Sequence, residues 1–279
     1  ISALISIPFY LSNYQVTFLN SFFEAISGFT GTGFSIFNNI KYLDPTLILW
    51  RSSSQWLGGL YFLFFLILIF SNKQFNFKLN ELTFSCDGSV NTKNNIKNLL
   101  LRIFIIYSLL SLIIFILLNI ANVRLFNSLN LSMSLISTGG FIPTNSLNSI
   151  INTNIQKIVI IFSFLISLLN FFLIFNIFEK KVIIKDHKED FYLFILIIFF
   201  ISIVYFNNFG GLDGIINVLS SIGNSGLTLM KSENNISLFY ILIAIIGGSL
   251  ISNTSGIKFT RIYILLRTAS IEIIKLISP

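Results

Sequence analysis

Charged residues, cysteine and histidine are scarce in this sequence. Only 10% of the 279 residues are charged, 54% are hydrophobic, and the mean hydropathy is +0.84, whereas a soluble domain carries about 25% charged residues. This composition excludes a soluble globular enzyme and a disordered chain, and it indicates a helical protein that crosses a membrane several times. The single cysteine, Cys86, cannot form an internal disulfide, and the single histidine, His187, lies too far along the chain to share a metal site with it.

Five charge-free runs are long enough for membrane-spanning helices, which need roughly 20 residues. They cover residues 52–72, 103–123, 158–178, 191–212 and 236–257. Residues 1–11 are apolar but too short to span, and we expect them to be the end of a truncated helix. The chain begins with Ile1 and has no basic segment before a cleavage site, so we expect a fragment without a signal peptide.

Lysine and arginine gather in alternate loops. The loops between the first and second runs, between the third and fourth, and after the fifth contain Lys73, Lys78, Lys93, Lys97, Arg102, Lys180, Lys181, Lys185, Lys188, Lys258, Arg261, Arg267 and Lys275. The positive-inside rule places these loops in the cytoplasm and the segments around Gly33, Gly140 and Gly226 on the outer side. Topology thus accounts for the net charge of +7, and no nucleic-acid partner is expected.

The outer segments resemble one another. Residues 27–34, 135–141 and 221–227 each contain small and hydroxyl residues, then glycine, then Phe or Leu. Each follows a stretch that predicts a short amphipathic helix, over residues 18–26, 125–135 and 213–221, and each precedes a long apolar run. A unit that recurs in this way predicts a pseudo-symmetric arrangement around an axis.

Such loops have a specific physical use. Non-helical backbone at membrane depth survives only where protein buries it or where it lines a water-filled cavity. Glycine permits conformations that turn carbonyl oxygens inward, and a ring of carbonyls can replace the hydration shell of a monovalent cation. An anion pathway would favour lysine or arginine here, and these loops have none. The alternative interpretation is that these are Gly/Ser/Thr turns at ordinary helix-packing sites.

Three motifs give the chain a family resemblance. They are residues 22–33 followed by Gln55-Trp56-Leu57-Gly58-Gly59, then Ser137-Thr138-Gly139-Gly140-Phe141, then Gly247-Gly248-Ser249 through residues 255–262. With these motifs the chain resembles the Trk/Ktr/HKT superfamily of potassium transporters, most closely the membrane subunit of bacterial Trk systems. The resemblance covers nearly the whole sequence.

The resemblance implies an all-α polytopic membrane protein in which M1–pore loop–M2 repeats surround a central ion pore. It divides the chain into residues 1–92, a first repeat with a truncated M1 and a cytoplasmic loop; 93–184, a second repeat; and 185–279, a third repeat with a broken M2 helix. The family's fourth repeat is expected to be absent, which leaves the filter with three of four walls.

The resemblance also assigns residues to a filter and a gate. The ion selectivity filter comprises Thr30, Gly31, Thr32, Gly33, Phe34, Ser137, Thr138, Gly139, Gly140, Phe141, Gly223, Asn224, Ser225, Gly226 and Leu227, with K⁺ at Thr32, Gly33, Gly139, Gly140, Ser225 and Gly226. The intramembrane gating loop comprises Gly247, Gly248, Ser252, Asn253, Thr254, Ser255, Gly256 and Lys258. The chain departs from the family pattern at Ile251, Asn253, Thr254 and Ser255 in the gate, and at Asn224 and Leu227 in the third filter.

The function implied is uptake of potassium across the inner (plasma) membrane by a non-enzymatic protein that carries K⁺ as its transported ion and no cofactor. The implied partners are the lipid bilayer, a second copy in a homodimer, and a cytosolic nucleotide-binding regulatory subunit like TrkA or KtrA. Two alternatives to potassium uptake remain within the family, namely a Na⁺-permeable member and an incomplete or degenerate fragment without transport. An intramembrane enzyme is a third class, but no two acidic residues share a span.

A few charged residues allow two interpretations. Glu24 and Asp213 are expected near the starts of short outer helices. There a negative charge either stabilises the helix by interacting with its dipole or attracts cations. Arg51 is expected to snorkel to the interface or to take part in gating. Lys258 is a positive-inside anchor or an electrostatic barrier at the inner mouth. The polar loop at residues 72–98 is a docking surface for a regulatory subunit or a flexible connector.

Overall fold

The computed structural model describes residues 1–70, 93–171, 173–174, 188–206, 211–229 and 234–277. The regular elements within these ranges are helices, and one isolated parallel bridge joins Ile246 to Ile257. The helices are α1 (Ser2–Tyr10), α2 (Phe18–Phe29), η1 (Ile40–Tyr42), α3 (Pro45–Phe70), α4 (Lys93–Ile120), α5 (Leu125–Ser137), η2 (Leu147–Ser149), α6 (Asn154–Leu168), α8 (Lys188–Phe206), α9 (Gly211–Gly223), α10 (Asn234–Ala244) and α11 (Phe259–Ile277).

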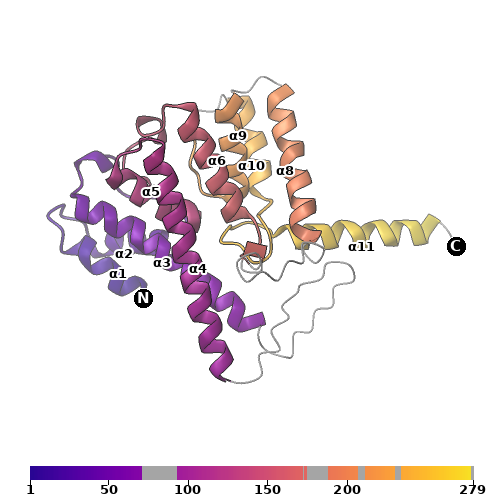
Figure 1. Ribbon diagram of the computed structural model, residues 1–279, viewed down its shortest axis with the longest axis horizontal. Coiled ribbons are helices and arrows are strands. Elements are labelled where there is room, and N and C mark those ends of the chain that lie inside the picture. The colour runs from indigo at the N-terminus through magenta and orange to yellow at the C-terminus, as the bar shows by residue number, and fades with distance from the viewer. Residues whose placement is uncertain (71–92, 172, 175–187, 207–210, 230–233, 278–279) are drawn as a thin grey trace.

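A three-helix unit occurs three times along the chain (Figure 1). In each unit a short helix, α2, α5 or α9, packs between the helix before it and the helix after it. The short helices α5 and α9 also pack against the last helix of the preceding unit, α3 and α6 respectively. The short helices therefore converge on one region, and the glycine-rich loops that follow them converge with them.

The short helices match the sequence-based prediction closely. Expected over residues 18–26, 125–135 and 213–221, they end at Phe29, Ser137 and Gly223. In α5 and α9, Leu131, Leu135, Ile216 and Leu219 are buried in one hydrophobic core with residues of α4 and α6. Burial of such side chains stabilises each helix by more than its intrinsic propensity does.

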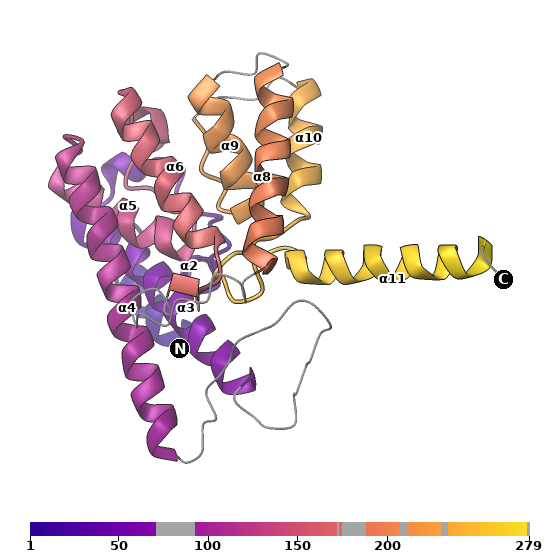
Figure 2. The same cartoon turned by 45° about the vertical axis from the view of Figure 1, so that its right-hand side comes forward.

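The long helices differ in part from the predicted spans. Among the residues that the structure describes, two stretches are long and apolar enough to cross a membrane, Leu100–Ile120 in α4 and Glu189–Phe206 in α8. The helix α3 begins at Pro45, before the run predicted to start at residue 52, while α6 ends at Leu168. The charge-free run over residues 236–257 is not one continuous helix: α10 ends at Ala244 and the chain resumes a helix only at Phe259, in the segment where the resemblance implies a broken M2 helix. Figure 2 shows that this last helix, α11, runs crosswise to α8 and α10 and leaves the bundle.

Candidate functional site

The three glycine-rich loops share one backbone conformation. Two residues in each loop, separated by one residue, have positive φ: Gly31 (69°) and Gly33 (80°), Thr138 (53°) and Gly140 (86°), Asn224 (52°) and Gly226 (68°). A threonine and an asparagine therefore adopt the left-handed conformation that glycine adopts in the first loop, at a cost of roughly 1–2 kcal/mol each. The loops are equivalent in backbone geometry and not only in composition, which is hard to reconcile with unrelated packing turns.

Hydrogen bonds at the ends of the short helices repeat in the same way. The amides of Thr32, Gly139 and Ser225 donate to the carbonyls of Ser27, Ser134 and Ser220, at 3.0, 2.9 and 3.0 Å. The amides of Gly31, Thr138 and Asn224 donate to the carbonyls of Gly28, Leu135 and Ser221, at 3.1, 3.2 and 3.1 Å. These bonds satisfy carbonyls that a helix terminus otherwise leaves unpaired, and they set the direction in which each loop departs.

The loops lie against one another in chain order. A Cβ atom on Gly33 would come within 2.6 Å of the Gly139 carbonyl oxygen, and one on Gly140 within 2.1 Å of the Ser225 carbonyl oxygen. A Cβ atom on Gly226, the equivalent glycine of the third loop, would meet no atom of the described chain within 4 Å. Each of the first two glycines thus leaves room for a backbone carbonyl of the next loop to lie against it.

A glutamine on α3 holds the second loop in place. The Gln55 side-chain amide donates to the Gly139 carbonyl at 2.5 Å, and its oxygen accepts from the Phe141 amide at 3.1 Å. Gln55 is fully buried, so both of these bonds form away from water. The residue belongs to one of the sequence motifs, but no pattern in the sequence assigns it this role.

Glu24 and Arg51 form a buried ion pair that supports the first loop. The Arg51 Nε donates to Glu24 Oε1 at 2.8 Å, and the exposed fractions of the two side chains are 1% and 0%. Glu24 also accepts from the Ser35 hydroxyl and from the Ile36 amide, and the guanidinium lies 4.2 Å from the ring centre of Phe141. The prediction that Arg51 snorkels to the interface is wrong, and Glu24 lies within α2 rather than near its start.

An uncharged side chain, Asn217, supports the third loop at the position equivalent to Glu24. Asn217 Oδ1 accepts from the Leu229 amide at 3.2 Å, at positions equivalent to Glu24 and Ile36. Its neighbour Asp213 lies in the first turn of α9, as predicted, and pairs with Lys157 at 2.5 Å. Sequence reasoning missed Asn217, although its spacing from Gly226 equals that of Glu24 from Gly33.

The second loop has neither acceptor nor donor at these positions. They are occupied by Leu131, which is fully buried, and by Pro143, which has no amide hydrogen. The three repeats therefore satisfy one backbone requirement in three ways.

The segment between α10 and α11 is a non-helical loop held against the second and third glycine-rich loops. The Asn253 side-chain amide donates to the Ile136 carbonyl at 3.0 Å, and the Thr138 hydroxyl donates to the Asn253 carbonyl at 3.2 Å. The Asn224 side-chain amide donates to the Ala244 carbonyl at 2.8 Å. Two residues that depart from the family pattern, Asn224 and Asn253, thus connect this loop to the second and third glycine-rich loops.

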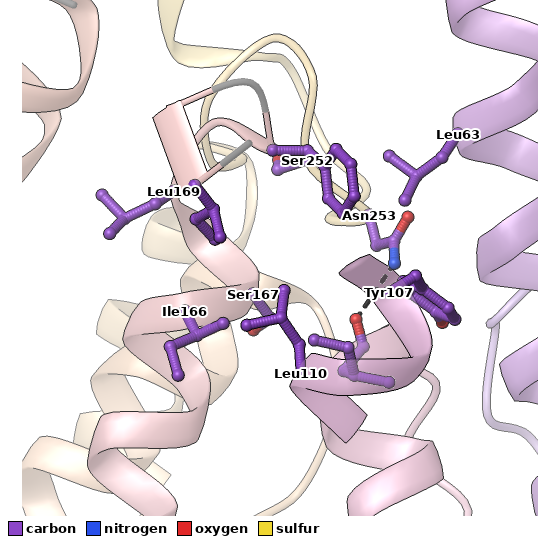
Figure 3. Close-up of a pocket in the computed structure, with 11 residues that line it drawn as sticks. Leu63, Tyr107, Leu110, Ile166, Ser167, Leu169, Ser252 and Asn253 are labelled. Carbon is purple, nitrogen blue, oxygen red and sulfur yellow. Dashed lines mark hydrogen bonds between the residues drawn. The ribbon is translucent and has the colours of Figure 1, made fainter. Parts of the chain in front are cut away.

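Other bonds fix the same segment to its surroundings. The Ser249 amide donates to the Leu168 carbonyl at 3.1 Å, and the Leu250 amide donates to Glu189 Oε1 at 2.8 Å. A cavity of about 20 Å³, large enough for one water molecule, lies beside the loop. Figure 3 shows Ser252 and Asn253 at this cavity, with Tyr107 and Leu110 of α4 and Ser167 of α6 around it.

Lys258 makes its contacts inside this loop. Its ammonium reaches back to the backbone and hydroxyl oxygens of Ser252 and Thr254, at distances from 2.5 to 3.2 Å. Its side chain is half-buried. This arrangement differs from the predicted positive-inside anchor, which would extend toward lipid headgroups.

Part of the predicted site lies outside the described residues. Cys86, His187 and residues 71–92 of the predicted docking loop are not described. The predicted filter and gate residues all fall within the described ranges. The structure brings the three glycine-rich loops together and places the predicted gating loop against two of them.

The repeated helices and the loops that turn back into the bundle define a polytopic helical membrane protein. The sequence matches the TrkH family, described as a cation transport protein, over residues 2–195, and the chain belongs to this family. It is 26% identical to an uncharacterized cation transporter of Methanocaldococcus jannaschii, with 98% of this chain and 58% of that protein aligned. It is 23% identical to the Trk system potassium uptake protein TrkG of Escherichia coli, over 100% and 61% of the two chains.

A solved structure confirms the fold. The crystal structure of the potassium transporter TrkH from Vibrio parahaemolyticus superposes with a TM-score of 0.82, at 18% identity, over 100% of this chain and 60% of that one. The chain spans about three fifths of the length of these relatives. Membership of a transporter family removes the intramembrane enzyme from consideration.

Proposed function

We propose that the chain supplies three walls of a potassium pathway and that the glycine-rich loops select the ion. The observation that carries the proposal is the shared alternation of positive φ in the three loops, together with their contact in chain order. The loops pack against one another through their backbones and contain no lysine or arginine, which supports a site whose carbonyls replace the hydration shell of a monovalent cation.

The ion is proposed to bind at Thr32 and Gly33, Gly139 and Gly140, and Ser225 and Gly226. The Gly139 carbonyl already accepts one bond from Gln55, and a carbonyl oxygen has a second lone pair for the ion. The short helices α2, α5 and α9 end at these loops, and the partly negative C-terminal end of each helix favours a cation there.

The remaining features of the proposal follow from the family. The names of the relatives, a cation transporter and a Trk system potassium uptake protein, support cation movement across a membrane. We propose an inner (plasma) membrane location with the glycine-rich loops outside and the lysine-rich loops in the cytoplasm, a homodimer, and a cytosolic nucleotide-binding regulatory subunit. Loop 247–258 acts as the gate below the filter.

Substitution of Gly140 by alanine tests the proposal in the full-length protein. The new methyl group meets the Ser225 carbonyl, and alanine at this positive φ is strained, so we expect rubidium uptake to fall by about tenfold or more. Uptake is measured in cells that lack other potassium uptake systems, with the amount of membrane-inserted protein determined in parallel.

Gly211→Ala is the matched control. Gly211 also has positive φ, 54°, but a Cβ atom there meets nothing within 4 Å, and the residue lies at the start of α9, away from the loop. We expect this variant to retain uptake. Equal uptake by the Gly140→Ala variant and the unmodified protein contradicts the proposal, and the same assay with sodium distinguishes a Na⁺-permeable pathway.

A further inference from the structure

Four oxygen atoms surround the ammonium group of Lys258. They are the carbonyl oxygens of Ser252 and Thr254, at 2.8 and 2.5 Å, and the hydroxyl oxygens of the same residues, both at 3.2 Å. We call this group of atoms the oxygen cage. A lysine ammonium has three hydrogens to donate and no acceptor, so it takes the place of a small monovalent cation.

The cage is built by the loop itself. The two hydroxyl groups lie 2.8 Å apart, and the Gly248 amide donates to the Thr254 hydroxyl at 2.9 Å. The Ser252 hydroxyl is also 2.7 Å from the Ser249 carbonyl. Ser252 and Thr254 are both buried, so the cage concentrates partial negative charge away from water, which is unfavourable unless a cation balances it.

Few other contacts hold the turn that carries the cage. On one side of Ser252 lies the cavity beside Tyr107 and Leu110, so close packing does not fix the turn there. The bonds of Asn253 to Ile136 and Thr138 hold the turn against the second glycine-rich loop. The turn that carries the cage is therefore the same turn that reaches the filter.

We propose that the oxygen cage is a monovalent-cation site of the intramembrane loop and that Lys258 is its tethered occupant. The ammonium keeps the loop closed, and a free monovalent cation takes its place when the ammonium is removed. The inference rests on the proposed function only in the choice of cation, since the cage is a feature of the loop alone.

Hydrogen exchange of the loop amides tests this inference without any transport assay. We compare the full-length protein with its Lys258→Met variant in detergent, in a rubidium buffer and in an N-methylglucamine buffer of equal ionic strength. In the variant we expect exchange at residues 247–257 to be about tenfold faster or more in N-methylglucamine, and to slow again in rubidium. The unmodified protein is expected to exchange slowly in both buffers, because its cage is already occupied.

Arg261→Gln is the matched control. Arg261 is an exposed cation three residues further along, at the start of α11, and its removal changes the charge of the segment without touching the cage. We expect wild-type exchange in this variant, and unchanged exchange of α5 and α9 in both variants as the check on folding.

Two results overturn the inference: exchange of the Lys258→Met loop at the wild-type rate, or fast exchange that rubidium does not slow. Failure of the proposed function is a separate outcome. In that case purified protein in vesicles carries no rubidium flux, whatever the exchange of the loop amides.

Discussion

The first and second repeats hold the same kind of loop by opposite means. In the first, the Glu24 carboxylate accepts from the amide of Ile36, and in the second, Leu131 and Pro143 occupy the equivalent positions. A buried amide needs an acceptor, and a proline has no amide to satisfy. The comparison teaches that the repeats preserve the backbone path of the loop, while the side chains that make this path possible have diverged.

The first repeat has to bury a charged pair, whereas the third does not. A carboxylate buried at Glu24 requires the equally buried Arg51, whereas the neutral Asn217 makes the equivalent bond to Leu229 without a counter-charge. Removing one member of a buried ion pair leaves the other uncompensated. The three repeats therefore differ in how much a single substitution at this position should cost.

The largest effect is expected from Glu24→Leu. This change leaves the buried Arg51 guanidinium without its carboxylate, and we expect the free energy of unfolding to fall by about 3–5 kcal/mol. The measurement is equilibrium unfolding in mixed detergent micelles. The double variant Glu24→Leu, Arg51→Met should regain part of the loss but not all of it, because the Ile36 amide still lacks its acceptor. A loss under about 1 kcal/mol in the single variant would show that the pair is not needed.

A smaller effect is expected from Pro143→Ala in the second repeat. The substitution adds an amide hydrogen opposite Leu131, where the side chain offers no acceptor, and it frees the unfolded chain. We expect a loss of about 2–4 kcal/mol, measured in the same way. Adding Leu131→Asn supplies the acceptor found in the third repeat and should restore part of the stability. If the second change brings no recovery, the equivalence of the repeats at this position is wrong.

The smallest effect is expected from Asn217→Leu in the third repeat. It removes the acceptor of the Leu229 amide but leaves no buried charge, so we expect a loss of about 1–3 kcal/mol. Combining it with Leu229→Pro copies the second repeat and should recover part of that loss. Equal losses in the single and double variants would indicate that Asn217 acts through some other contact.

The sequence predicted the parts of this fold that depend on local pattern. The three short helices begin within two residues of their predicted starts, because their apolar faces repeat at helical spacing. The sequence-based prediction was wrong where residues far apart in the chain determine whether a side chain is buried and what it pairs with. The partner of Arg51 lies 27 residues away on another helix, and no pattern within one helix reveals that both charges are buried.

The candidate site, too, could be predicted only where it depends on local sequence pattern. The glycine-rich loops could be recognised because the repeat makes them comparable, and their role in ion selection stays a prediction. Gln55 could not be recognised, because its bonds to Gly139 and Phe141 depend on how α3 packs against α5. The end of α10 at Ala244 lies inside a charge-free run, residues 236–257, so charge alone did not reveal it, and the interruption was predicted only from the family resemblance with its broken M2 helix.

The bond between Gln55 and Gly139 joins residues 84 positions apart, with the support preceding the loop that it supports. During synthesis at about 5–20 residues per second, α3 leaves the ribosome roughly 4–17 s before the second loop does. The first repeat is then in place as a template when the second arrives, and the second in turn presents Gly140 to the third. Biosynthesis can therefore add the three loops one at a time, in the direction in which the chain is made.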